Sequence, residues 1–445
     1  MALTGLQIYK LLPQTNCKEC GFPTCLAFAM KLAAKQAELK ACPYVSEESK
    51  RQLEAAAQPP IRLITIATGD RKAVAGNEIV LFRHEKTFYN PVPIFVRIKD
   101  TEANLEARVK ELNAFSVDYV GIKLRLNGVA IDNASGDAGK FAAAVETVRG
   151  ATDFPLILIA KDPAAFEAAM AKANGAIPLL YAADASNWQA MAELAKKFKT
   201  PLAVKANGLE ALANLTEQIK ATGVEDLVLD PGARDFLGTL TLATQIRRLA
   251  IKKNFRPLGY PIITFPGEGV QSPEEEPVLA TQHIGKYAGF IVLDHFTPAS
   301  AYALLVLRQN IYTDPQKPIQ VQPGLYEINS PKPESPVLVT TNFSITYFAV
   351  SNEVEGAGLP AWLLVADAEG MSVLTAWAAG KFDADRIAKA VKTANVESRV
   401  SRKRVVLPGA VSVLLGEVEE ALPGWQVDVG PREAVDIPAY LKVKP

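Results

Sequence analysis

All four cysteines of the 445-residue chain lie within its first 42 residues. They are Cys17, Cys20, Cys25 and Cys42, with two, four and sixteen residues between successive members. Cysteines gathered in this way, with no secretory signal before them, indicate a metal or cluster site better than a disulfide scaffold, which is typical of small secreted domains. Structural zinc sites usually combine two tight pairs, so one pair followed by two isolated cysteines favours a [4Fe-4S] cluster. Zinc and unliganded thiols are the weaker alternatives.

The long spacing before the last cysteine constrains the path of the chain. A straight helix from Leu26 to Lys40 would place Cys42 roughly 20 Å from Cys25, too far to share a cluster. An apolar stripe at helical spacing, formed by Leu26, Ala29, Met30 and Ala33, predicts a helix that ends near Ala34. The polar residues Lys35 to Lys40 are then expected to turn the chain back, so that a small domain is held together by its cluster.

Charges balance over the whole chain, with 48 lysines plus arginines and 48 aspartates plus glutamates. This balance does not indicate binding to nucleic acid or to an anionic membrane. No apolar run reaches the roughly 18 residues of a membrane-spanning helix, so we expect a cytoplasmic protein. At about 150 residues per domain, length and composition predict a cluster domain (1–57), a central domain (58–312), a proline-rich linker (313–335) and a last domain (336–445).

The central domain alternates short apolar runs with segments long enough for helices. Eight runs begin at Ile94, Tyr119, Leu156, Ile177, Leu202, Asp226, Ile262 and Phe290. This alternation predicts a closed parallel (β/α)8 barrel, the TIM-barrel fold. Two earlier runs, Arg62 to Ala67 and Glu78 to Phe82, are predicted to pair as a hairpin that covers one end of the barrel.

Polar residues follow the predicted barrel strands, where barrel enzymes place their active sites. They are Lys123, Asn127, Lys161, Asp184, Lys205, Asp230, Glu268 and Asp294. Such residues also cap the helices that follow, which is the simpler interpretation. No nucleophile can be paired with a base, so no catalytic residue is predicted. Among the histidines, His283 is predicted to be structural, and His295 is the best polar candidate in the barrel.

The last domain has predicted strands that end near Thr340, Asp367, Pro408 and Gly430. This pattern predicts a small open α/β sheet, in which ligands bind beyond the carboxyl ends of the strands. Four loops would line one crevice there, 341–346, 368–375, 409–410 and 431–434. Each loop alone is explained as a turn or helix cap, but their coincidence favours a ligand site.

The cysteine motif, which also includes Gly21 and Pro43, and the order of domains that follows it closely resemble one known family. This family is the large (gamma) subunit of the corrinoid/iron-sulfur protein of the reductive acetyl-CoA (Wood-Ljungdahl) pathway. The resemblance covers the whole chain. It rests mainly on domain order, because barrels are common and the cysteine motif also resembles the iron-sulfur segment of membrane electron-transport subunits. It implies an N-terminal [4Fe-4S] domain, a central TIM barrel and a C-terminal Rossmann-like corrinoid domain.

The resemblance also implies a function. The corrinoid cobalt(I) would accept a methyl group from methyltetrahydrofolate, bound on a separate methyltransferase, and donate it to acetyl-CoA synthase. The [4Fe-4S] cluster would reductively reactivate cobalt(II). The chain would thus be the methyl carrier of a corrinoid-dependent methyltransferase system in anaerobic carbon fixation, and not an enzyme by itself. Implied partners are a small barrel subunit in a heterodimer, the methyltransferase, acetyl-CoA synthase/CO dehydrogenase and an electron donor such as ferredoxin.

Corrinoid contacts are expected in the strand-end loops that the family uses. The expected residues are Thr340, Thr346, Gly370, Met371, Ser372, Val373, Leu374, Thr375, Gly409 and Ala434. No histidine follows His295, so the last domain cannot supply a histidine beneath cobalt. This agrees with base-off binding in the family, which makes the cobalt easier to reduce. The proline-rich linker is expected to let this domain move between partners.

Two other functions remain open from the sequence. The first is an electron-transfer iron-sulfur protein without corrinoid, whose barrel and last domain only dock partners. The second is a barrel methyltransferase that binds the pterin itself. Corrinoid absorbance would exclude the first, and folate binding by this chain alone would support the second.

Overall fold

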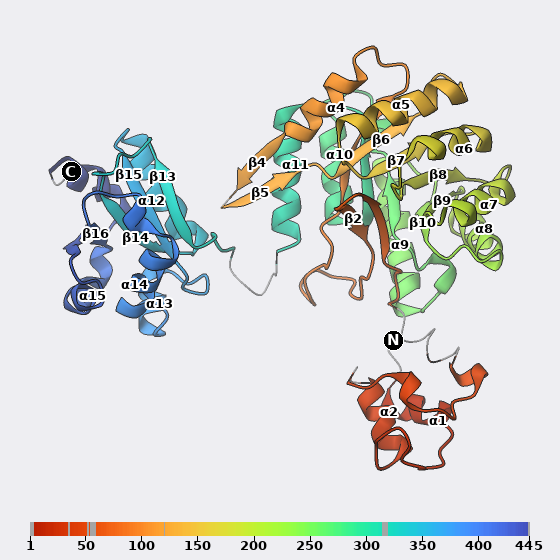
Figure 1. Cartoon of the computed structure of the whole chain (residues 1–445), viewed down its shortest axis with the longest axis horizontal. Coiled ribbons are helices and arrows are strands. Elements are labelled where there is room, and N and C mark those ends of the chain that lie inside the picture. The colour runs from red at the N-terminus through yellow and green to blue at the C-terminus, as the bar shows by residue number, and fades with distance from the viewer. Residues whose placement is uncertain are drawn as a thin grey trace. The chain divides into compact units, whose positions relative to one another are not determined.

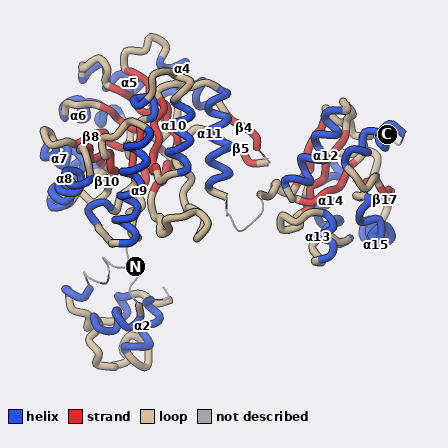
Figure 2. Tube along the Cα trace, turned by 180° about the vertical axis from the view of Figure 1, so that it is seen from behind, coloured by secondary structure: helices blue, strands red, loops and turns tan. Residues whose placement is uncertain are grey.

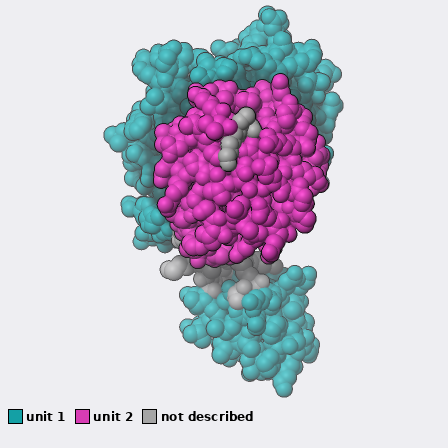
Figure 3. Space-filling model, turned by 90° about the vertical axis from the view of Figure 1, so that its left-hand side faces the viewer, with its two compact units in different colours: residues 1–116, 125–312 teal, residues 117–124, 313–445 magenta. Residues whose placement is uncertain are grey.

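The computed structural model of the chain describes residues 4–33, 36–50, 53, 59–119, 121–313 and 319–443. Figure 1 shows its helices and strands in chain order. The chain forms two compact units: residues 1–116 with 125–312, and residues 117–124 with 313–445. Figure 3 colours them separately. Within the described ranges, no helix has both the length and the apolar character needed to cross a bilayer.

The N-terminal segment folds around two short helices. Helix α1 (Gly5–Leu11) begins with a capping box, in which the side chains of Thr4 and Gln7 each accept a hydrogen bond from the other's backbone N–H. Helix α2 (Cys25–Ala33) and the 3-10 turn η1 (Leu39–Ala41) follow. The predicted reversal is confirmed, because Cys25 and Cys42 belong to the same small apolar core. Within the described residues this helix runs to Ala33, and Ala34 and Lys35, where the helix was predicted to end and the turn to begin, lie outside them.

The predicted barrel is confirmed as a closed ring of eight parallel strands. In chain order the strands are β3 (Ile94–Lys99), β6 (Gly128–Asp132), β7 (Leu156–Ile159), β8 (Leu179–Ala183), β9 (Leu202–Lys205), β10 (Leu227–Asp230), β11 (Ile262–Thr264) and β12 (Ala288–Leu293). Helices surround the strands (Figure 2). They are α4 (Leu105–Ala114), α5 (Ala138–Ala151), α6 (Pro163–Lys172), α7 (Trp188–Phe198), α8 (Leu209–Ala221), α9 (Phe236–Lys252), α10 (Glu276–Gly285) and α11 (Pro298–Ile311), with 3-10 turns η2 (Arg256–Leu258) and η3 (Pro266–Gly269).

The predicted second barrel strand is wrong. The run that begins at Tyr119 is divided by Gly121, whose φ of +78° suits a turn, and it contributes to the hairpin β4 (Ser116–Tyr119) and β5 (Ile122–Arg125). The barrel uses β6 instead, in which the first four of five residues are buried. A strand covered on both faces needs a continuous apolar run, which the half-exposed β5 does not provide. Residues 117–124 belong to the second compact unit.

A hairpin closes the amino end of the barrel, as predicted, but its second strand is not the predicted run. Strand β1 (Ile64–Thr68) pairs with β2 (Arg71–Ala75) through a tight turn at Gly69, whose φ is +55°. Ile64 and Ile66 pack with the first inward-facing residues of the barrel, such as Phe95. The run from Glu78 to Phe82 forms no strand.

The last domain is the predicted open α/β sheet, with strand order β13-β15-β14-β16-β17. The four parallel strands are β14 (Val337–Thr341), β15 (Ala361–Ala366), β16 (Arg404–Leu407) and β17 (Gln426–Val429). Helices α12 (Ser344–Gly356), α13 (Val373–Ala378), α14 (Ala384–Thr393), α15 (Leu415–Ala421) and α16 (Ile437–Val443) accompany 3-10 turns η4 (Val396–Ser398), η5 (Gly409–Leu414) and η6 (Ala434–Asp436). Successive residues of a strand point to opposite faces of the sheet, so Val339 packs in one hydrophobic core and Leu338 in another.

Part of the predicted linker is built into this sheet. Within residues 313–335, strand β13 (Gly324–Ile328) pairs antiparallel with β15. The linker prediction therefore missed a strand. The five residues of this strand contain no proline, but the proline density of the surrounding segment predicted an extended connection. Residues 314–318, at the start of the predicted linker, lie outside the described part of the chain.

Candidate functional site

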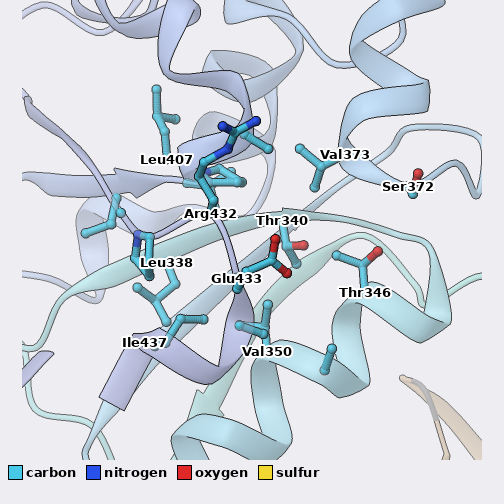
Figure 4. Close-up of a pocket in the computed structure, with 18 of the residues that line it drawn as sticks. Leu338, Thr340, Thr346, Val350, Ser372, Val373, Leu407, Arg432, Glu433 and Ile437 are labelled. Atoms are coloured by element: carbon cyan, nitrogen blue, oxygen red, sulfur yellow. The ribbon is translucent and has the colours of Figure 1, made fainter. Parts of the chain in front are cut away.

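A cavity of about 320 Å³ opens at the carboxyl ends of the parallel strands in the last domain. The loops after β14, β16 and β17 and the start of α13 all contribute to it, as the sheet topology predicts. Figure 4 shows the side chains that surround it. The lining residues are Leu338, Val339, Thr340, Thr346, Ala349, Val350, Ser372, Val373, Leu374, Val406, Leu407, Pro408, Ala410, Gly430, Pro431, Arg432, Glu433, Ala434 and Ile437. The site thus combines apolar walls with a few polar groups, as ligand pockets do.

One hydroxyl in this cavity lacks a hydrogen-bond partner within the described part of the chain. Thr340, the fourth residue of β14, is 1% exposed, and its Oγ1 has no partner among the described residues. An unpaired buried polar group costs free energy comparable to a lost hydrogen bond, so native proteins rarely leave one without a purpose. Because Thr340 also lines the cavity, a polar ligand group can satisfy it.

Asn342 fixes the loop that leads into α13. Its side-chain oxygen accepts hydrogen bonds from the N–H groups of Ala368 and Gly370, each at 2.9 Å. Asn342 is 1% exposed, so these two hydrogen bonds are shielded from solvent. Gly370 has a φ of +74°, and a Cβ there would lie 2.7 Å from the side chain of Gln320. Glycine is therefore required for the close packing of this loop.

Six of the ten predicted contact residues line the cavity. These are Thr340, Thr346, Ser372, Val373, Leu374 and Ala434. The other four, Gly370, Met371, Thr375 and Gly409, do not line it. Thr375 accepts a hydrogen bond from Ser372 at 3.0 Å, and a Cβ on Gly409 would lie 2.5 Å from the carbonyl oxygen of Gly430. These two residues therefore support the lining loops from behind, and the ten remain predicted corrinoid contacts.

Two charged residues of the cavity escaped the sequence prediction. Arg432 and Glu433 both line it and project around its opening in Figure 4. They lie in the loop 431–434, which the strand-end argument selected, but only Ala434 was chosen from it. Charged residues after a strand usually signify exposure, so their type gave no signal that they face a cavity.

The four cysteines are free thiols of one small segment. Cys25 is buried in its core, Cys20 and Cys42 pack against that core, and Cys17 is exposed. The pKa of the Tyr44 hydroxyl is raised, first by its hydrogen bond to Glu19 and further by Cys17 and Cys42 nearby. Among the described residues, no three histidine, cysteine or carboxylate side chains are arranged to hold a metal ion. Three of the four thiols lie in or against one core, and Cys17 is in the same segment. Four cysteine thiolates are the donor set of a [4Fe-4S] cluster, and these four remain its predicted ligands.

The carboxyl end of the barrel is filled by an ion-pair network. Arg234 makes two hydrogen bonds to the buried Asp230, at 2.8 and 3.0 Å, and a third to Glu268 at 2.5 Å. Arg97 binds Glu268 at 2.6 Å and Asp294 at 3.0 Å. Three of the predicted strand-end residues therefore come together, and each forms an ion pair with one or both of two arginines.

Burial and pairing oppose each other in this network. Burial alone would raise the pKa of Asp230, but the hydrogen bonds and charge of Arg234 hold it below the usual value. The pKa of Tyr181 is raised well above its ordinary value, mainly by burial and by Asp230, to which its hydroxyl donates a 2.5 Å hydrogen bond. Tyr181 thus stays protonated and Asp230 ionised. This arrangement pairs Asp230 with Tyr181 and Arg234 inside the barrel, and the absence of a catalytic residue stays a prediction.

The remaining strand-end candidates are dispersed. Lys123 lies in the β4–β5 hairpin, and Asn127 binds Arg308 at the amino end of the barrel, at 2.6 Å. Asp184 accepts a hydrogen bond from the N–H of Ser186 at 2.8 Å, which forms a local turn, whereas the N-cap residue of α7 is Asn187, so the predicted capping role is wrong for Asp184. His295 is held through Nδ1 by Glu276 at 3.0 Å.

The buried His283 predicts acid sensitivity of the barrel. Burial, together with the charge of Arg234, lowers its pKa from 6.5 to about 4. The unfolded chain therefore takes up this proton first, and stability is lost as the pH falls from about 6.5 to 4. We expect a contribution of about 3 kcal/mol over that range. Urea unfolding at pH 7 and pH 4.5 should show a smaller acid-induced loss for His283→Gln than for the wild type; equal losses would contradict this.

Comparison with known proteins identifies the family. The family model described as CO dehydrogenase/acetyl-CoA synthase delta subunit matches residues 63–441, and that described as putative Fe-S cluster matches residues 12–44. The corrinoid/iron-sulfur protein large subunit of Moorella thermoacetica is 46% identical, with 99% of each chain covered. The acetyl-CoA decarbonylase/synthase complex gamma subunit of Methanopyrus kandleri is 36% identical, with 99% of this chain and 97% of the relative covered.

These relatives include the cysteine segment, which the first family model leaves out. The resemblance inferred from the cysteine motif and the domain order is thereby confirmed. The chain belongs to the family of corrinoid/iron-sulfur protein large subunits and acetyl-CoA decarbonylase/synthase gamma subunits.

Proposed function

We propose that this chain is a methyl carrier that holds a corrinoid in its last domain and a [4Fe-4S] cluster in its N-terminal segment. The observation that carries the proposal is the strand-end cavity with the unpaired Thr340 hydroxyl, in a chain whose full-length relative is named a corrinoid/iron-sulfur protein. When bound, the corrinoid supplies a cobalt centre that takes up and gives up methyl groups, and the cluster supplies electrons to it.

The protein's part is to bind and orient the corrinoid. Thr340, Thr346 and Ser372 offer hydroxyls to polar edges of the ligand, while Val373, Leu374 and Ala434 offer apolar contact. The Asn342 hydrogen bonds preorganise the loop before α13, so little ordering is needed on binding. Gly370, Met371, Thr375 and Gly409 act through this loop framework.

Base-off binding is proposed because the absence of histidine after His295 agrees with it. Without a protein imidazole ligand the cobalt would be easier to reduce, which suits repeated reactivation by the cluster. Cys17, Cys20, Cys25 and Cys42 would bind that cluster. This division of tasks explains why one chain carries two separate binding regions.

The proposed partners follow the relatives. We propose that the chain works with an acetyl-CoA synthase/CO dehydrogenase, because relatives are named as gamma subunits of an acetyl-CoA decarbonylase/synthase complex. A small barrel subunit, a methyltetrahydrofolate:corrinoid methyltransferase and an electron donor such as ferredoxin complete the proposal. Movement of the last domain on the chain that precedes β13 would let the corrinoid reach two active sites.

Metal analysis with an anaerobic visible spectrum tests the proposal. We expect about four irons and one cobalt per chain, with corrinoid absorbance. Cys42→Ser should lower iron and keep cobalt, because the two cofactors use separate regions. Iron without cobalt would instead support an electron-transfer protein, and zinc in place of iron would refute the cluster.

A further inference from the structure

Asn16, the residue before Cys17, forms two hydrogen bonds with Cys25. The side-chain oxygen of Asn16 accepts a hydrogen bond from the N–H of Cys25 at 2.8 Å. In return, the N–H of Asn16 donates to Sγ of Cys25 at 3.4 Å. The two bonds join the loop that carries Cys17 and Cys20 to the first residue of α2.

The backbone of this loop explains why asparagine stands there. Asn16 has a φ of +52°, in the left-handed region, where asparagine is one of the few tolerated residues apart from glycine. This conformation is the one in which its N–H meets the Cys25 sulfur while its side chain meets the Cys25 N–H. Glycine would keep the backbone but lose the side-chain clamp.

A second contact ties the same loop to the last cysteine. The Tyr44 hydroxyl donates to Glu19 Oε1 at 2.8 Å, so the segment after Cys42 is joined to the residue before Cys20. This contact is exposed and touches no sulfur, whereas the Asn16 contact reaches Cys25, which is 6% exposed. The two contacts therefore differ in whether they act on a thiol.

We propose that Asn16 is a positioning residue for the iron-sulfur site: its side chain fixes Cys25, and its backbone N–H donates to that sulfur. This inference deepens the proposed function. A hydrogen bond to a ligand sulfur favours the more negative, reduced state of a cluster and so raises its reduction potential. Asn16 would thereby set both the retention of the cluster and its potential.

The test uses the full chain with substitutions at two neighbouring left-handed residues. Asn16→Gly keeps the backbone conformation and removes the clamp, and Asn16→Asp restores the acceptor oxygen. Gln14→Gly is the matched control, because Gln14 has a φ of +59° and its side chain donates to the Tyr9 carbonyl instead of contacting a cysteine.

Three measurements follow for each variant. Asn16→Gly should lose iron to a chelator several times faster than wild type. Glycine keeps the backbone N–H, but without the side-chain clamp the Cys25 sulfur is no longer held against it. At a fixed solution potential, the ratio of reduced to oxidised cluster should therefore fall up to about tenfold, which is ~59 mV for one electron. In the metal-free chain, Cys25 should be alkylated about fivefold faster, because a less confined thiol is more accessible. Asn16→Asp should restore iron retention and slow alkylation, and Gln14→Gly should match wild type throughout.

Opposite results would overturn the inference. It fails if Asn16→Gly matches wild type, if Gln14→Gly changes as much, or if Asn16→Asp does not restore retention. If Asn16→Gly assembles no cluster at all, iron binding by Asn16→Asp tests whether the lost acceptor oxygen is the cause. Cobalt content then reports whether the rest of the chain has folded. The alkylation measurement needs no metal. A wild-type chain with zinc or no metal would therefore refute the proposed cofactor, while Cys25 reactivity still decides the role of Asn16.

Discussion

Replacing Arg234 by methionine is expected to destabilise the barrel by about 3–5 kcal/mol at pH 7. The substitution removes the partner of Asp230, which is fully buried, and leaves its carboxylate uncompensated. Glu268 loses one of its two arginines in the same step. Hydrogen exchange of peptides from β10 and β11 across a urea series would report the stability of this part of the chain.

The pH dependence of the stability loss in Arg234→Met tests whether the unpaired Asp230 carboxylate causes it. Without Arg234, the folded-state pKa of Asp230 should rise, because burial would then be opposed only by the hydrogen bonds from Tyr181 and from the N–H of Gly232. The folded variant would take up a proton as the pH falls, so its deficit relative to wild type should shrink on acidification.

Arg62→Met is the matched control. Arg62 pairs with Glu225 and Asp226, each at 2.8 Å, but both carboxylates are more than half exposed. We expect a loss of at most about 1 kcal/mol from this surface pair. Equal losses of stability in Arg62→Met and Arg234→Met would contradict the expectation that the buried barrel network contributes more stability than the surface ion pair.

Replacing Thr346 by tryptophan is expected to weaken corrinoid binding at least about 100-fold, or by nearly 3 kcal/mol. Thr346 lies in the first turn of α12 and lines the strand-end cavity, so an indole would occupy the space of the ligand. The residue is only half-buried and the cavity is open, so the domain itself should fold. Cobalt content and corrinoid absorbance of the purified chain measure the effect.

The same substitution at Thr393 provides the control. Thr393 ends α14 in the same domain and lines a different cavity, which shares no lining residue with the strand-end cavity. Thr393→Trp should keep its corrinoid, and both variants should keep their iron. Loss of cobalt in both would indicate a general defect of the domain, and retention in both would place the corrinoid elsewhere.

Hydrophobic patterning predicted most of the fold, and its failures have physical causes. Seven of the eight predicted barrel runs contain barrel strands, because a strand covered on both faces must be continuously apolar. The run at Tyr119 is interrupted by Gly121 and Lys123, and the positive φ of Gly121 makes a hairpin of it. Strand β13 was missed because neighbouring prolines outweighed a short segment whose pairing with β15 is long-range.

The sequence by itself determined the ligand chemistry of this protein. Cysteine spacing is local, and it was sufficient to indicate a cluster and to require the chain reversal that brings Cys42 back to the core of Cys25. The absence of histidine after His295 likewise needs no coordinates. The order of strands and helices also located loops that line the strand-end cavity.

Only the tertiary structure decided which residues of those loops face the cavity and which support it. Arg432 lines the cavity, whereas Gly409 lies against the neighbouring loop, although both follow a strand. The tertiary structure also showed that Asp230, Glu268 and Asp294 form ion pairs with two arginines. The reason is physical: side-chain direction and charge pairing depend on contacts between segments far apart in the chain, and residue type and spacing do not encode them locally.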